Sequence, residues 1–158
     1  MRITLREATE SDAEAIHRMQ LEAFTPLLKK YRDYGTSPAT EPLEKTVSRI
    51  KNPDSRYYMI LAEDELAGAI HIVRKEKQGS LWISPIFIGT AHQGKGIAQT
   101  AMTMAEEQFA DDKIWELSTL AEEAGNCHLY EKLGYQRTAK ERKINDRATL
   151  VYYKKEMD

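Results

Sequence analysis

Apolar residues alternate or run together in the middle of the chain and predict three consecutive strands. The strands cover Tyr57–Ala62, Leu66–Val73 and Ser80–Ile88, and turns at Glu63–Glu65 and Lys75–Gly79 join them. Runs of this length with aromatic and β-branched residues are typical of strands, and short polar turns join antiparallel neighbours. The sequence therefore predicts an antiparallel meander.

The chain before the meander begins with a short predicted strand at Ile3–Arg6. Apolar residues then recur at a spacing of three or four, which indicates helices. A helix follows with one apolar face, formed by Ile16, Met19, Ala23 and Phe24. Pro26 and the later prolines then divide the next stretch into two short helical segments, Leu27–Tyr34 and Leu43–Ile50.

After the meander, another amphipathic helix extends to Phe109. Its apolar residues recur at helical spacing and can pack on a sheet: Ile97, Ala101, Met104 and Ala105. Lys113–Leu120 is then a strand parallel to Ser80–Ile88, because a right-handed helical crossover joins the two. The last elements are a short helix within Ala124–Tyr135 and a hairpin of Arg137–Arg142 and Ala148–Lys154. The prediction is an α/β (α+β) fold with a mixed, largely antiparallel central sheet of six or seven strands, flanked by helices.

The composition fits one domain of enzyme size. With 158 residues and 41% hydrophobic side chains, the chain can bury one substantial core, so residues 1–158 are predicted to form a single domain. The net charge of −2 argues against a nucleic-acid partner, whose binding surface would be basic. Cys127 is the single cysteine, and neither a leader nor an apolar run of membrane length is recognisable. We therefore expect a cytoplasmic protein without a membrane partner.

The turn between the third strand of the meander and the next helix resembles a phosphate-binding loop. Gly94 and Gly96 flank Lys95 just before the helix. The first N–H groups of a helix lack partners inside it and lie at the positive end of its dipole, so glycines there let an anion approach closely. Lys95 adds positive charge. The alternative is an ordinary turn that happens to contain two glycines.

Three phosphate-binding patterns compete for this loop. The dinucleotide pattern G-x-G-x-x-G is incomplete, because Gln99 stands at its last position. The triphosphate pattern G-x-x-x-x-G-K-[ST] fits Gly89 and Gly94-Lys95, but Gly96 replaces the hydroxyl residue that would hold magnesium. The third pattern, Q/R-x-x-G-x-G/A, is complete in residues 93–98. This segment resembles the pyrophosphate-binding segment of the GNAT superfamily of N-acetyltransferases.

A second motif carries the same resemblance. Leu129–Tyr135 reads L-Y-E-K-L-G-Y, which is similar to the L-Y-E-K-x-G-[FY] element of the family, and the two motifs stand in the family's order. The resemblance implies a GNAT-like fold and a metal-free enzyme that moves an acetyl group from acetyl-CoA directly to a primary amine. It implies that the backbone of Phe87 and Ile88 orients the pantetheine arm and the thioester. The residues implied to bind the pyrophosphate are Gln93, Gly94, Lys95, Gly96, Ile97 and Ala98.

The resemblance also assigns a catalytic acid. Tyr130 matches the tyrosine that protonates the leaving thiolate in many family members, and a phenol with an ordinary pKa of ~10 suits that task. The alternative is a tyrosine that only packs. Asn126 either contacts the coenzyme or caps the helix. Glu123 occupies the position of the family's frequent asparagine, seven residues before the tyrosine.

The general base has no clear candidate, because the family's frequent glutamate is absent from the strand before the loop. Glu116, His71, His128 or a water molecule could serve. The four histidines show no metal-ligand spacing, so no metal is predicted. We do not expect Cys127 to be a nucleophile, because direct transfer needs no covalent intermediate.

Two other functions remain open at this point. The missing glutamate allows a non-catalytic acyl-CoA-binding module of the same fold, and Gly89 with Gly94-Lys95 allows a nucleotide-binding phosphotransferase. The acceptor is unidentified, since protein N-termini, polyamines, amino sugars and small metabolites all carry amines. Edge strands and exposed apolar residues leave a homodimer open.

Overall fold

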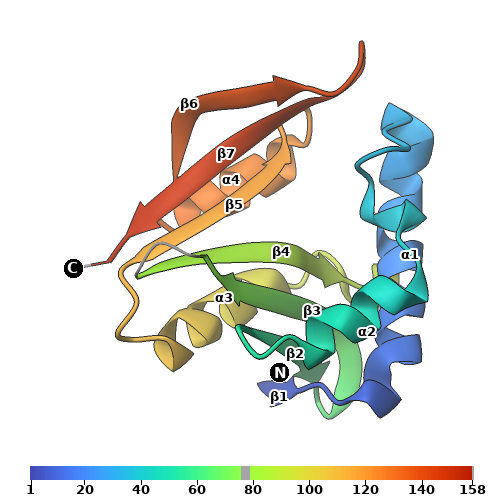
Figure 1. The fold of residues 1–158 in the computed structure, drawn as a ribbon, viewed down its shortest axis with the longest axis vertical. Helices are drawn as coiled ribbons and strands as arrows, with labels where there is room; N and C mark the ends of the chain where they lie inside the picture. Colours follow the sequence, from blue (N-terminus) through green and yellow to red (C-terminus); the bar gives the residue numbers. More distant parts are fainter. Residues whose placement is uncertain (76–78, 158) are drawn as a thin grey trace.

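The computed structural model describes residues 1–75 and 79–157. Within these ranges, seven strands form one sheet in the order β1-β2-β3-β4-β5-β7-β6, with helices on both faces (Figure 1). The elements are β1 (Ile3–Glu7), α1 (Ala13–Tyr31), α2 (Leu43–Lys51), β2 (Ser55–Ala62), β3 (Glu65–Arg74), β4 (Ser80–Ile88), α3 (Ile97–Gln108), β5 (Ile114–Leu120), α4 (Ala124–Lys132), β6 (Gln136–Lys143) and β7 (Thr149–Glu156). The predicted fold class is confirmed. Most of the turn predicted at Lys75–Gly79 lies outside the described residues.

The sheet splits between β4 and β5 near the end of β4. Neighbouring strands are antiparallel except β4 and β5, which are parallel as the crossover rule predicts. In the described chain, β4 and β5 pair through Ser80–Trp82 and Ile114–Glu116 and then diverge (Figure 1). The last residues of β4 therefore present backbone groups on that edge that β5 does not use.

A bulge shapes the same strand. The register between β3 and β4 shifts so that Ser84 and Pro85 both stand opposite His71. Extra residues on one strand bend it and increase its twist. Beyond the bulge the two strands approach closely at Gly68, where a Cβ atom would lie 2.2 Å from the carbonyl oxygen of Phe87. Glycine at this position lets the end of β4 keep its course.

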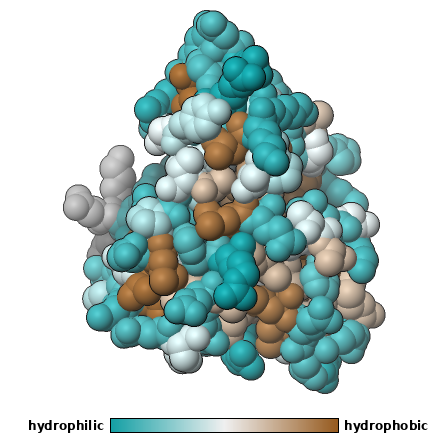
Figure 2. Space-filling model, turned by 90° about the vertical axis from the view of Figure 1, so that its right-hand side faces the viewer, coloured by the Kyte–Doolittle hydropathy of each residue, from teal (hydrophilic) through white to brown (hydrophobic). Residues whose placement is uncertain are grey.

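Each face of the sheet has its own apolar core. Helices α3 and α4 cover the larger core, which contains Ile97 and Trp115. Helices α1 and α2 cover the smaller one, which contains Ile16 and Phe87. The Phe24 ring of α1 meets Phe87 edge-on, with ring centroids 6.0 Å apart. Seen from the side of α1, the surface is mostly hydrophilic with separate hydrophobic patches (Figure 2).

The predicted break at Pro26 is wrong. The sequence pattern starts a separate helical segment at Leu27–Tyr34, but α1 continues through Pro26 as far as Tyr31. Proline removes one hydrogen bond from a helix interior, yet packing of α1 on the sheet outweighs this local penalty. Arg32, in the left-handed conformation, ends the helix instead. Among the described residues, no helix has the length and apolar character needed to cross a bilayer.

Candidate active site

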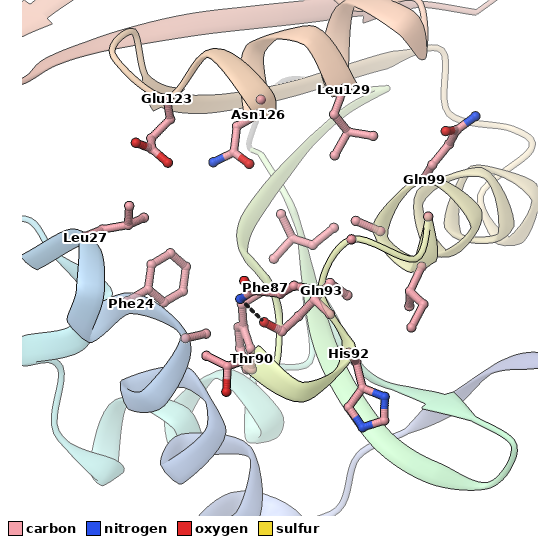
Figure 3. Close-up of a pocket in the computed structure, with 18 of the residues that line it drawn as sticks. Phe24, Leu27, Phe87, Thr90, His92, Gln93, Gln99, Glu123, Asn126 and Leu129 are labelled. Atoms are coloured by element: carbon pink, nitrogen blue, oxygen red, sulfur yellow. Dashed lines mark hydrogen bonds between the residues drawn. The ribbon is translucent and has the colours of Figure 1, made fainter.

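A cavity of about 540 Å³ lies where β4 ends, between α1, α4 and the loop before α3 (Figure 3). Its wall is drawn from within residues 23–27 of α1, 86–88 of β4, 90–99 around the loop, and 123–130 at the start of α4 and just before it. This volume is in the usual range for small-molecule sites. Four segments that are distant in sequence therefore form one candidate site.

The predicted phosphate-binding loop lies at this cavity. Gly94 and Gly96 both have a φ of +77°, in the left-handed region that favours glycine. Apart from chain neighbours, no described residue lies within 4 Å of the place where a Cβ atom would stand at either glycine. Helix α3 begins at Ile97, so its first N–H groups lie next to this open space. Such backbone can gather N–H donors around an anion, so the loop fits a diphosphate.

Most of the predicted coenzyme-binding residues line the cavity: Phe87, Ile88, Gln93, Gly94, Gly96, Ile97, Ala98 and Asn126. Lys95 is exposed and is not among the described lining residues. The Gln93 side-chain amide donates a hydrogen bond to the Ile88 carbonyl at 2.9 Å, and so ties the loop to the end of β4. Gln93 therefore shapes the loop with its side chain.

Tyr130 reaches the cavity from α4. Its side chain is almost buried and packs against Tyr135 and Tyr153, with ring centroids 6.3 and 6.1 Å away. Burial raises the pKa of Tyr130 to about 12, and Cys127 acts in the same direction. The phenol is therefore protonated throughout the neutral range, which is the form that a proton donor needs.

The three predicted base candidates are absent from the described cavity wall. Glu116 accepts a hydrogen bond from the Ser80 hydroxyl at 2.9 Å and pairs with Lys75 at 3.3 Å. Burial acts to raise the pKa of Glu116, but the Ser80 hydrogen bond and the Lys75 charge outweigh it and lower the pKa. His128 is exposed on α4.

His71 contacts the bulge in β4. Its ring is buried beside Tyr57, with centroids 5.1 Å apart, and Nδ1 donates a hydrogen bond to the Ser84 carbonyl at 2.8 Å. Burial lowers the pKa of His71 to about 4, so the ring is neutral near pH 7. These contacts suit a residue that fixes the bulge and thereby the course of β4.

We expect His71 to make the fold less stable in acid. The unfolded chain, with a histidine pKa of ~6.5, binds the proton before the folded chain does, so the free energy of unfolding falls between about pH 6.5 and pH 4 by up to about 3 kcal/mol. Below both pKa values this loss no longer grows. The variant His71→Asn keeps a donor for Ser84 and should show a shallower decline in urea denaturation across this range. An equal decline in both proteins would contradict the assignment.

The cavity also contains residues for which no sequence pattern indicated a function. Phe24 belongs to the apolar face predicted for the first helix, and Leu27 begins the segment predicted after it, and both line the cavity. Glu123 lines the cavity too, and its Oε2 accepts a hydrogen bond from the Tyr31 hydroxyl at 2.5 Å. The one signal that could have identified Glu123 is its departure from the asparagine frequent in the family.

Comparison with known proteins defines the class. The sequence pattern of the acetyltransferase (GNAT) family matches residues 13–135, which is more than three quarters of the chain. The chain therefore belongs to the GNAT acetyltransferase family, and the predicted enzyme class, an acyltransferase, is confirmed. No curated protein matches the chain in sequence.

Several solved structures share the fold over almost the whole chain. A chimera of the spermidine N-acetyltransferase SpeG from Vibrio cholerae and hSSAT has 20% identity and a TM-score of 0.78, covering 99% of this chain and 96% of that one. The ribosomal-protein-S18-alanine N-acetyltransferase from Escherichia coli has 12% identity and a TM-score of 0.79, covering 99% and 95%. The Vibrio cholerae spermidine N-acetyltransferase, solved with CoA and spermine, has 21% identity and a TM-score of 0.75, covering 96% and 94%. At these identities the likeness establishes the fold.

Proposed function

We propose that this protein is a cytoplasmic, acetyl-CoA-dependent N-acetyltransferase that moves the acetyl group directly to a primary amine. The observation that carries the proposal is the pair of left-handed glycines, Gly94 and Gly96, which face open space beside the first turn of α3. Tyr130 lines the same cavity. One cavity therefore combines a diphosphate cradle with a protonated phenol.

This arrangement supports a specific mode of acetyl-CoA binding. The backbone N–H groups of residues 94–98 hold the diphosphate without a metal, and Lys95 adds attraction from the outer side of the loop. The backbone of Phe87 and Ile88, at the end of β4 that has left β5, bonds the pantetheine arm. The Asn126 side chain contacts the coenzyme from α4.

The transfer requires three proton movements. The acceptor ammonium first loses a proton to water, and the neutral nitrogen attacks the thioester carbonyl, so that a C–N bond forms and the C–S bond breaks. The Tyr130 hydroxyl gives its proton to the departing thiolate and regains one from the new amide nitrogen. The products are the acetylated amine, the thiol of CoA and one proton released to solvent.

A non-catalytic acyl-CoA-binding module is the second candidate. It is favoured by one observation, namely that Glu116, His71 and His128 are absent from the described cavity wall. Such a module would bind CoA and acetyl-CoA equally well and transfer nothing.

An acetyl-CoA consumption assay separates the two candidates. Release of the CoA thiol is followed with a thiol reagent across alkyl amines, polyamines, amino sugars and peptides with free N-termini. The enzyme should release CoA in an amine-dependent manner, whereas the module should bind acetyl-CoA without releasing it for any amine. A protein that binds neither CoA nor acetyl-CoA would contradict both candidates.

A further inference from the structure

We propose that Glu123 binds an ammonium group of the acceptor, so that the enzyme selects positively charged aliphatic amines. This assignment rests on the proposed N-acetyltransferase function. Among the described residues that line the cavity, Glu123 alone carries a carboxylate. It is therefore the lining group best suited to attract a cation.

The position of Glu123 suits the acceptor end of the cavity. Its carboxylate points into the cavity from the start of α4, next to Phe24 and Leu27 of α1, whereas Gln99 lies on the opposite side (Figure 3). Gln99 belongs to the first turn of α3, next to the loop that fits the diphosphate. A coenzyme with its diphosphate at that loop leaves the side near α1 for its reactive end and for the acceptor.

Two contacts hold the Glu123 carboxylate in place, and both are to the same oxygen atom. The Tyr31 hydroxyl donates a hydrogen bond to Oε2 at 2.5 Å, and Tyr31 itself is buried. Lys30 Nζ lies 3.5 Å from the same oxygen. Both contacts are to Oε2. They fix the orientation of the carboxylate, and its other oxygen, Oε1, can accept a hydrogen bond from a ligand.

The ion pair with Lys30 shows that the Glu123 carboxylate can hold an ammonium group of the kind proposed for the acceptor. Lys30 is an ammonium on an aliphatic stem, and it already lies beside the Glu123 carboxylate. Its side chain is 63% exposed, so water competes with the pair and an acceptor can displace it. Phe24 and Leu27 give the neighbouring wall an apolar surface, against which the methylene groups of an alkyl amine can pack.

This role is recognition, and Glu123 is not required to take the acceptor's proton. Aliphatic amines have a pKa close to that of lysine, ~10.4, and are ammonium ions at neutral pH. A carboxylate binds this charged form and raises its local concentration. The proton that must leave before attack goes to water, as in the transfer proposed above.

The test compares two variants that remove the same charge from adjacent positions. Glu123→Gln keeps the shape of the side chain and can still accept the Tyr31 hydrogen bond. Glu122→Gln is the control, because Glu122 accepts a hydrogen bond from the Thr149 backbone at 2.9 Å and is not a described lining residue. Calorimetry measures first CoA binding, and then binding of 1,4-diaminobutane to each CoA-saturated protein.

We expect 1,4-diaminobutane to bind the wild-type protein and Glu122→Gln equally, and Glu123→Gln about tenfold more weakly, with CoA affinity unchanged in all three. Equal diamine binding by Glu123→Gln, no diamine binding by the CoA-saturated wild type, or a loss of CoA binding in Glu123→Gln would overturn the assignment. Failure of the wild type to bind CoA would instead overturn the proposed function on which the assignment rests.

Discussion

The variant Tyr130→Phe is expected to lower kcat by about a hundredfold to a thousandfold and to leave the KM for acetyl-CoA within about twofold. The phenylalanine ring preserves the packing against Tyr135 and Tyr153 but removes the proton that the thiolate takes. Because burial raises the pKa of Tyr130 to about 12, the hydroxyl of the wild type stays protonated at neutral and mildly alkaline pH. The acid should therefore remain available over that whole range.

A matched control isolates the effect of that hydroxyl. Tyr152 lies on β7, outside the described cavity wall, with its ring 6.2 Å from Trp82. The variant Tyr152→Phe removes one phenolic hydroxyl as well and should keep normal kinetics. Steady-state rates for both variants, measured where chemistry is the slow step, decide the question. Unchanged kcat in Tyr130→Phe would remove Tyr130 from the acid role.

The second large effect is expected at the loop before α3, where Gly96→Leu should weaken CoA binding by about a hundredfold or more. The new side chain would occupy the open space beside the first N–H groups of α3 and keep the diphosphate away from them. It would also strain a backbone held at a φ of +77°, at a cost of about 1–2 kcal/mol.

Backbone strain alone can be separated from loss of the anion site. Gly79 has the same φ of +77° and, likewise, no described residue near its missing Cβ apart from chain neighbours, but it precedes β4 and is not a described lining residue. The variant Gly79→Leu should lose a similar amount of stability and bind CoA normally. Calorimetric titration with CoA measures the difference. Equal CoA affinity in the two variants would contradict the loop assignment.

The sequence predicted correctly those strands, helices and turns whose conformation depends on residues close together in the chain. The alternating residues of β2, β3 and β4, the amphipathic stripe of α3 and the glycines of the loop all act within a few positions along the chain. The parallel pairing of β4 with β5 followed from the handedness of crossovers. The amino-acid sequence alone therefore suffices to predict these parts of the fold.

Features that depend on distant partners could not be predicted in the same way. Pro26 disfavours a helix locally, but the packing of α1 on β4 outweighs this effect. The residues of β4 are too far away in sequence for a local pattern to include them. The bulge at Ser84 and Pro85 depends on the register of β3, and His71 bonds it from that strand. Glu123 lines a cavity that residues of α1 also line, and no local pattern around Glu123 contains that distant helix.

The same reason limits how much of the chemistry could be predicted. The two family motifs pointed to the loop at residues 93–98 and to Tyr130 as candidate site residues, because each motif is continuous in sequence. The proposed acceptor side lies between α1 and the start of α4, which are about a hundred residues apart and carry no shared motif. Side chains there are identified by their position in the cavity alone.

A crystal structure of the protein with CoA tests the central claim most directly. We predict that the diphosphate lies against Gly94 and Gly96, with backbone N–H groups of the first turn of α3 donating to its oxygens and the pantetheine arm running along the end of β4. A structure in which the diphosphate is bound elsewhere, while protein side chains fill the space beside these two glycines, would contradict the account.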